Sequence, residues 1–168
     1  DRTSCQNDYA TFCGMRNAQY CEWSVEALGS YLKDMERAEA EGRNLAREKY
    51  IRMMKSTDPA AYEKFSAELP EVSAEKTELV GKIWAVLLRQ TERMREKYPL
   101  IALGGRPLHA KEERGGWASI ETYQTSELET YSESTLCEFL KNLEQMEADG
   151  LDFAFRVQEN TIHFAGYP

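Results

Sequence analysis

Two segments of the chain repeat each other, and this internal repeat constrains the fold more than any other feature of the sequence. Residues 24–46 (SVEALGSYLKDMERAEAEGRNLA) align without gaps on residues 132–154 (SESTLCEFLKNLEQMEADGLDFA), at a shift of 108 positions. Nine of these 23 positions are identical, and they include Ser24 with Ser132 and Gly42 with Gly150. Serine caps the beginning of a helix and glycine ends one, so what repeats is a structural unit.

A chance likeness between amphipathic helices is the alternative explanation, but amphipathicity alone requires neither a shared cap nor a shared terminal glycine. Upstream, the same shift pairs Tyr9 with Trp117 and Phe12 with Ile120. We therefore predict two three-helix units, at about residues 8–54 and 116–164. A pseudo-twofold axis between them is one arrangement that the repeat allows.

Helical spacing of apolar residues dominates the remaining sequence, and strand-like alternation is almost absent. The chain is therefore predicted to be all-α, a bundle of about eight helices. The longest helix is expected from Ser73 to Tyr98; its middle is apolar over most of its circumference, which places it at the centre of the bundle. Residues 99–117 contain four glycines and no periodicity, which predicts a long loop. We expect a single helical domain, residues 1–168, in which helices within 58–98 and the loop 99–117 join the two repeat units.

Charge and hydropathy exclude two classes of partner. Acidic residues outnumber basic ones 29 to 21, and the net charge of −8 repels a phosphate backbone. We therefore expect no binding of nucleic acid. No apolar run approaches the roughly 20 residues that span a bilayer, so no membrane segment is expected.

The four cysteines, Cys5, Cys13, Cys21 and Cys137, form no CxxC pair. Two disulfides are possible in a secreted chain of this size, but we find no export signal. We interpret the cysteines as reduced thiols of a cytoplasmic protein.

Three stretches, SCQNDYATFCGMRNAQYCEW, EGRNLAREKYIRMM and ETYQTSELETYS, resemble a family of bacterial proteins with an uncharacterised domain. Some members of that family carry a fused nucleotidyltransferase-like domain. The resemblance covers nearly the whole chain and implies a bacterial, cytoplasmic protein, without an assigned chemistry. The polar residues within the matching stretches are the first candidates for a binding site: Cys5, Gln6, Asp8, Arg16, Gln19, Arg43 and Asn44.

A polar cluster is predicted on the first helix, where Asp8, Arg16 and Gln19 lie beside the apolar stripe instead of opposite it. Burying such groups without partners costs several kcal/mol. In one interpretation Arg16 holds an anionic ligand, which Asp8 and Gln19 orient. In the other, Asp8 pairs with Arg16 or Gln19 in a network that fixes the two halves against each other.

A basic run, Arg43, Arg47, Lys49, Arg52 and Lys55, forms the second candidate. Arg43 and Arg47 lie one turn apart near the start of a helix, where a carboxylate or phosphate also finds free backbone N–H groups. The alternative is a solvated helix face whose charge the acidic residues of positions 36–41 neutralise.

Other chemistry is weakly indicated. Cys5 with His109 or His163 has the residue types of a cysteine nucleophile and its base, but no motif orients them. Neither histidine follows a glutamate by three residues, so the spacing of a di-iron bundle site is missing and no metal site is predicted. The pair of Arg156 and His163 loosely resembles arginine–histidine ribonuclease motifs of helical toxins.

The sequence favours a binding or interaction module for a small anionic ligand or a partner domain. The alternative is an enzyme with a pocket between the two halves, which Cys5, Asp8, Arg16 and Gln19 line and which the loop with Arg106 and His109 covers. An enzyme predicts a concave pocket with converging titratable groups, whereas an interaction module predicts an exposed apolar patch.

Overall fold

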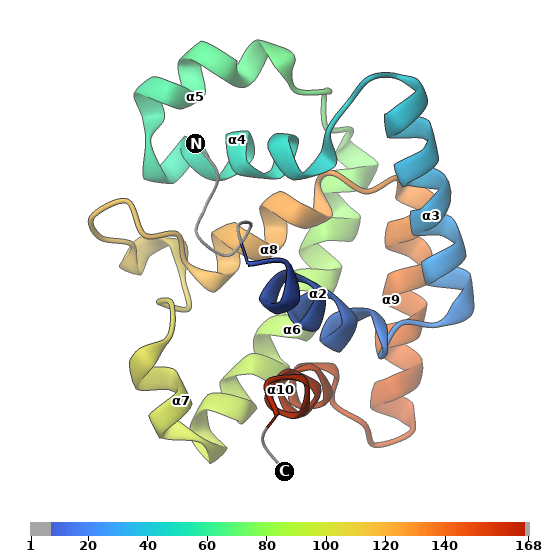
Figure 1. The fold of residues 1–168 in the computed structure, drawn as a ribbon, viewed down its shortest axis with the longest axis vertical. Coiled ribbons are helices and arrows are strands. Elements are labelled where there is room, and N and C mark those ends of the chain that lie inside the picture. Colours follow the sequence, from blue (N-terminus) through green and yellow to red (C-terminus); the bar gives the residue numbers. More distant parts are fainter. Residues whose placement is uncertain (1–7, 167–168) are drawn as a thin grey trace.

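The chain is built from α-helices. The computed structural model describes residues 8–166, apart from the side chains at positions 101, 102 and 104 (Figure 1). No strand forms within these residues, and the prediction of an all-α protein is confirmed. In chain order the elements are α2 (Tyr9–Tyr20), α3 (Val25–Ala40), α4 (Leu45–Thr57), α5 (Pro59–Phe65), the 3-10 turn η1 (Ser66–Glu68), α6 (Ala74–Lys97), α7 (Pro99–Gly104), the 3-10 turn η2 (Ala110–Glu112), α8 (Ile120–Leu128), α9 (Glu133–Ala148) and α10 (Phe153–Phe164).

The similar segments fold into helices with matching bounds. α3 and α9 are each 16 residues long, and the hydroxyls of Ser24 and Ser132 cap their first turns by accepting a backbone N–H. After each helix the backbone turns through a left-handed glycine, Gly42 with a φ of 68° and Gly150 with a φ of 72°. A backbone hydrogen bond of 2.8 Å closes the turn in both places. Glycine takes this conformation without a steric cost, which is why it ends both helices.

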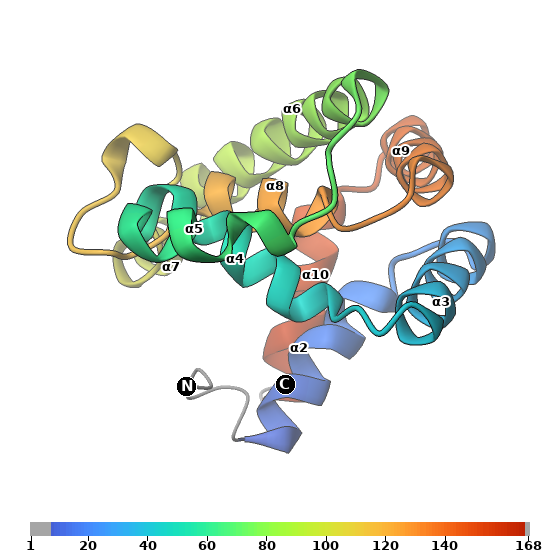
Figure 2. The same ribbon diagram turned by 90° about the horizontal axis from the view of Figure 1, so that it is seen from above.

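The helices of the first and second halves pack crosswise. α2 packs on α10 and α8 packs on α4, while α3 and α9 pack on each other (Figures 1 and 2). Each half therefore completes the core of the other. Asp34 of α3 illustrates this coupling, because its buried carboxylate accepts hydrogen bonds from the Ser132 N–H at 2.8 Å and the Thr135 hydroxyl at 2.6 Å, both on the second half.

Aromatic side chains from both halves form the centre of the core. Trp23 stacks on Phe139 with ring centroids 4.5 Å apart, and Tyr31 meets Tyr131 edge-on at 4.9 Å. Trp23 and Tyr131 also meet edge-on at 5.8 Å, which joins the two pairs. Such large rings bury much apolar surface, so this cluster helps to hold the two halves together.

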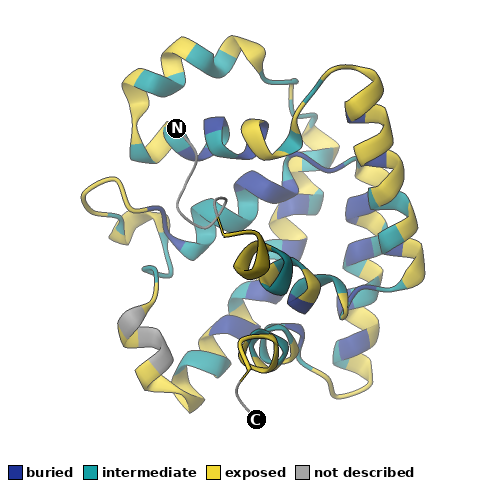
Figure 3. Cartoon of the chain, in the orientation of Figure 1, coloured by how far each residue is buried: buried dark blue, intermediate teal, exposed yellow. Residues whose placement is uncertain are grey.

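The long helix α6 differs in its position from the prediction. It packs on α8, α9 and α10 through a face that includes the buried Ile83 and Leu87. Its opposite face, with Lys82, Ala85 and Arg89, is exposed (Figure 3). α6 thus covers one side of the bundle and does not lie at its centre, because only one stripe of the helix meets other helices.

Residues 99–117 are also more ordered than the predicted long loop. They contain α7 and η2, and an isolated β-bridge joins Arg114 and Trp117. Arg106 donates to the carbonyl of Ala118 at 3.0 Å, which ties the segment to the start of α8. Elements of only one or two turns leave no periodicity in the sequence, and for this reason the pattern analysis missed them.

Candidate functional site

Three charged side chains from three helices meet beneath α2. Arg16 of α2 and Lys49 of α4 both form ion pairs with the carboxylate of Glu127 on α8. Lys49 and Glu127 are buried, with exposed side-chain fractions of 3% and 7%, whereas Arg16 keeps 23% exposed. The Tyr131 hydroxyl donates a third hydrogen bond to Glu127, at 3.0 Å. We call Arg16, Lys49 and Glu127 the buried charge cluster.

Aromatic rings surround the buried charge cluster. The Lys49 ammonium lies 3.2 Å from the centroid of the Tyr123 ring, a cation–π contact that partly replaces lost hydration. Tyr20 and Tyr31 lie side by side with ring centroids 5.7 Å apart. Burial is the main cause that raises the pKa of both hydroxyls, so they remain protonated and able to donate hydrogen bonds.

The electrostatics of the cluster are unbalanced. Burial alone would raise the pKa of Glu127, but the charges of Lys49 and Arg16 outweigh it and lower the pKa. Burial lowers the pKa of Lys49, although Glu127 opposes the shift. For Arg16, burial would also lower the pKa, but the attraction of Glu127 raises it. With all three groups ionised, two cations share one carboxylate, and one positive charge stays uncompensated in a place where charge is costly.

A cavity of about 680 Å³ opens above this cluster, between α2, α3 and the first turn of α4. Arg16, Lys49 and Glu127 lie in its wall together with apolar groups such as Phe12 and Met35. This volume lies within the range of small-molecule sites. The combination offers a cationic end and an apolar wall, which suits a ligand that has both an anionic group and an apolar body.

Three of the residues predicted from the sequence line this cavity: Arg16, Arg43 and Asn44. Arg43 forms a two-pronged ion pair with Glu48, at 2.8 and 2.9 Å, and a further contact with Glu41 at 3.0 Å. Asn44 caps α4 with its side-chain oxygen. Both therefore have structural partners, and Arg16 is the candidate that reaches the buried charge cluster.

The other predicted residues lie elsewhere. Asp8 is exposed and caps α2 through the backbone N–H and hydroxyl of Thr11, at 3.1 and 2.8 Å, so it pairs with neither Arg16 nor Gln19. Gln19 is half-buried and does not line the cavity. Arg47 points away and pairs with the exposed Glu68 at 2.8 Å. Cys5 and Gln6 lie outside the described residues.

Lys49 and Glu127 are the residues that the sequence analysis missed. In the sequence Lys49 belongs to a basic run, for which a solvated helix face is one of two interpretations. The structure instead buries the Lys49 side chain. The repeat contains a signal that would have separated it from the run, because Val157 occupies the corresponding position of the second half. A lysine where the repeat has an apolar residue indicates a buried charge. Glu127 corresponds to Gln19, which gives no comparable signal.

The loop residues proposed to cover a pocket are not at this cavity. Arg106 lies over the Tyr123 ring, 5.3 Å from its centroid, and His109 lies 3.6 Å from the Glu121 carboxylate. His163 is exposed in the last turn of α10. None of the three lines the cavity.

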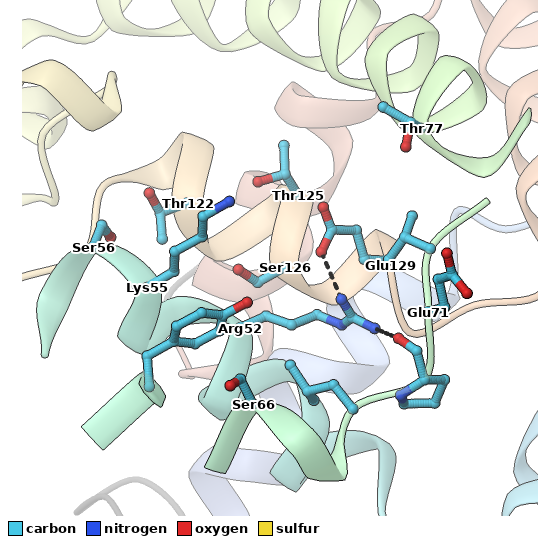
Figure 4. A pocket seen from close by; sticks show the side chains of 14 residues that line it. Arg52, Lys55, Ser56, Ser66, Glu71, Thr77, Thr122, Thr125, Ser126 and Glu129 are labelled. Carbon is cyan, nitrogen blue, oxygen red and sulfur yellow. Dashed lines mark hydrogen bonds and ion pairs between the residues drawn. The ribbon is translucent and has the colours of Figure 1, made fainter. Parts of the chain in front are cut away.

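A second cavity, of about 760 Å³, lies between α4, α5 and α8 (Figure 4). Arg52 crosses it and donates to the Glu129 carboxylate at 3.1 Å and to the Pro70 carbonyl at 2.9 Å. Lys55 and Glu71 also line it, so the two basic residues are matched by two acidic ones. Serine and threonine hydroxyls make up much of the remaining wall. This balanced, polar surface does not attract an anion in the way that the buried charge cluster does.

Other kinds of site receive no support in residues 8–166. No group of three or more histidine, cysteine or acidic residues in this range is placed to hold a metal ion. No helix there is long and apolar enough to cross a membrane. Cys13, Cys21 and Cys137 are free thiols.

Comparison with known proteins identifies a family and no activity. A family model with the description "Protein of unknown function (DUF4125)" matches residues 1–168. No curated protein and no solved structure gives a significant match.

Proposed function

Because the chain belongs to the DUF4125 family of proteins of unknown function, we propose its function from its own residues: it is a binding module that holds an anionic group in the cavity above the buried charge cluster. The anionic group is a carboxylate or a phosphate. The cytoplasmic and bacterial setting implied by the sequence resemblance is part of this proposal.

The observation that carries the proposal is the excess of positive charge in the cluster. Glu127 is the single carboxylate that pairs with both Arg16 and Lys49. Arg16 is the most exposed member of the cluster, and an anion bound next to it supplies the missing negative charge while both cations stay in position. The binding energy then comes in part from a charge that the unliganded protein holds at a cost.

The backbone supports the same ligand chemistry. The first turn of α4 borders the cavity through Leu45 and Ala46, and N–H groups in the first turn of a helix have no partner within that helix. These groups and the helix dipole favour negative charge. The 13-residue helix α4 and the buried charge cluster therefore act on the same space.

We also infer that residues 8–54 and 116–164 are copies of one three-helix unit. The equal bounds of α3 and α9, the shared serine caps and the shared left-handed glycines support this inference. So does the crosswise packing, in which α2 on α10 corresponds to α8 on α4.

The alternative function, an enzyme that uses Cys5, Asp8 and Arg16, loses one of its members because Asp8 lies outside the cavity and caps α2. Its cysteine step stays a prediction. We favour the binding module, since the groups that converge on the cavity serve to hold an anion and include no exposed nucleophile with a base.

The proposal is tested by thermal unfolding with added inorganic phosphate and, separately, with benzoate. A ligand at 100 times its Kd stabilises by about 2.7 kcal/mol, which is a readily measured rise in Tm. Arg16→Met should abolish the rise, and its fold should persist because Lys49 still balances Glu127.

Arg47→Met is the matched control, since its ion pair with Glu68 is exposed and lies away from the cavity. It should respond like the wild type. This comparison also removes the general stabilisation that phosphate gives to folded proteins. An equal response of Arg16→Met and wild type to both anions, or no response of either, contradicts the proposal.

A further inference from the structure

The turn between α9 and α10 holds a carboxamide group. The side-chain oxygen of Gln90, on α6, accepts a hydrogen bond from the Ala154 N–H at 3.2 Å, and its side-chain nitrogen donates to the Glu147 carboxylate at 3.3 Å. Gln90 is fully buried there. One backbone donor and one carboxylate acceptor therefore match the carbonyl and the NH2 group of a single amide.

The corresponding turn of the first half has the same backbone conformation. The shift of 108 positions pairs Glu39 with Glu147 and Ala46 with Ala154. Both turns contain a left-handed glycine, whose N–H donates to the carbonyl of the glutamate at 3.0 Å in the first half and 3.1 Å in the second. In both, a capping side chain opens the next helix by accepting a backbone N–H. The backbone therefore holds Glu39 and Ala46 in the same relation to each other as Glu147 and Ala154.

Glu39 and Ala46 both line the cavity above the buried charge cluster. Among residues 8–166, the Glu39 carboxylate forms no ion pair or hydrogen bond. Ala46 is the second residue of α4, where a backbone N–H has no partner within the helix. The cavity thus presents to a ligand the same donor and acceptor that bind the amide of Gln90 in the second half.

Charge decides which group fits between Ala46 and Glu39. A carboxylate could accept from the Ala46 N–H with one oxygen, but it would bring a second negative charge toward Glu39, and like charges repel. An ammonium suits Glu39 but offers no acceptor to the Ala46 N–H. A primary carboxamide satisfies both groups, as Gln90 does in the second half. The place for the anionic group of the ligand is then next to Arg16, in the same cavity.

We propose that the cavity binds a small molecule that has both a primary carboxamide and an anionic group on an apolar body. The carboxamide lies between Ala46 and Glu39, and the anionic group lies next to Arg16. Phe12, one turn before Arg16, and Met35, one turn before Glu39, line the same cavity and contact the apolar body. This inference rests on the proposed function, because it names the class of ligand that the anion site takes. A volume of about 680 Å³ suits a ligand of this size.

Isothermal titration calorimetry of the whole chain with matched aromatic acids tests the proposal. Benzoate supplies the anionic group alone, and meta- and para-carbamoylbenzoate add the carboxamide. The mismatched counterparts replace the carboxamide by a second carboxylate, by an aminomethyl group or by its dimethylamide. The flexible monoamide of adipic acid, with adipate and hexanoate as its counterparts, covers other separations of the two groups.

At least one carbamoyl acid should bind about tenfold more tightly than its parent acid and than each of its mismatched counterparts. The proposal is overturned if no carbamoyl acid shows this preference. Tighter binding of an aminomethyl acid also overturns it, because an ammonium then occupies the place assigned to the carboxamide.

Glu39→Gln should exchange the preference for a carboxamide for one for a second carboxylate. The new side chain is uncharged and can donate to a carboxylate through its own NH2 group. The carbamoyl acid should therefore lose about tenfold in affinity relative to benzoate, and the dicarboxylate should gain. Glu36→Gln is the matched control, since Glu36 is an exposed glutamate of the same helix that does not line the cavity. An unchanged preference in Glu39→Gln contradicts the assignment.

The response to phosphate separates this inference from the proposed function. Glu39→Gln leaves the buried charge cluster intact and removes a negative charge from the cavity wall. Phosphate should therefore raise the Tm of this variant at least as much as that of the wild type. A wild type that responds to phosphate without preferring a carbamoyl acid shows that the inference is wrong and that anion binding stands. A wild type that responds to none of the anions shows that both are wrong.

Discussion

Lys49 and Glu127 form one buried ion pair, but the excess of positive charge around it predicts opposite effects on stability when each residue is replaced. Glu127→Gln leaves Arg16 and Lys49 buried without a counter-charge, and breaking a buried pair in this way costs about 3–5 kcal/mol. Lys49→Met leaves Arg16 and Glu127 as a balanced pair and removes a cation that is 3% exposed. We expect this variant to be between unchanged and about 2 kcal/mol more stable than the wild type.

Urea unfolding followed by circular dichroism measures both effects. With a slope of about 2 kcal/mol per molar urea, a loss of about 4 kcal/mol lowers the midpoint by about 2 M. When Glu127→Gln and Lys49→Met are combined in one protein, Lys49→Met should restore about half of the stability that Glu127→Gln removes, because only Arg16 then remains unpaired. The charge interpretation is refuted if Glu127→Gln costs less than about 1 kcal/mol, or if Lys49→Met destabilises as strongly as Glu127→Gln.

The pH dependence adds an independent check on Lys49. Its pKa is lower in the folded protein than in the unfolded chain, so the unfolded chain binds more protons between the two values. The cost of holding Lys49 charged is therefore full at low pH and decreases as the pH rises toward the usual lysine pKa of about 10.4. The stability that Lys49→Met gains over wild type should therefore shrink as the pH rises from the folded-state pKa of Lys49 toward about 10.4. A stability difference that does not change with pH contradicts the burial of a charged Lys49.

Two further predictions concern the backbone turns and the segment before α8. Gly42→Ala and Gly150→Ala should each cost about 1–2 kcal/mol in thermal unfolding, since an added Cβ meets nothing within 4 Å and only the left-handed backbone is strained; a more than twofold difference between the two contradicts a common conformation. Burial alone would raise the pKa of Glu113, but hydrogen bonds with Thr122 and Ser119 outweigh it and lower the pKa to about 2. Glu113→Gln should therefore cost about 1 kcal/mol at pH 7 after solvent screening, and the difference from wild type should vanish as the pH falls from about 4.5 toward 2; a pH-independent difference refutes the ionic explanation.

Most of the helix bounds were predictable from the sequence, because local residues set them. Ser24, Ser73 and Ser132 each cap a helix that begins at the next residue, and Pro59 is the first residue of α5, a position that favours proline. The short elements α7 and η2 were not predictable from periodicity. The position of α6 was also missed, because an apolar middle section does not indicate how many of its sides meet another helix.

The candidate site was predictable only in part. Arg16 and Arg43 were identified from their place in the sequence, and both line the cavity. The sequence does not distinguish Asp8 as a helix cap from Asp8 as an ion-pair partner. In the structure its short side chain caps α2. Glu127 and Arg16 are 111 positions apart in the sequence, so no local pattern could predict their contact.

The sequence alone determined the all-helical class, the caps and the terminal glycines, because each depends on interactions within a few residues. Only the tertiary structure decided which charges meet. The crosswise packing of α2 on α10 and α8 on α4 brings Arg16, Lys49 and Glu127 from three helices to one buried point. It also decided that α6 covers α8, α9 and α10, whereas Leu32 and Met35 of α3 stay 51% and 42% exposed, a difference that the repeat does not reveal.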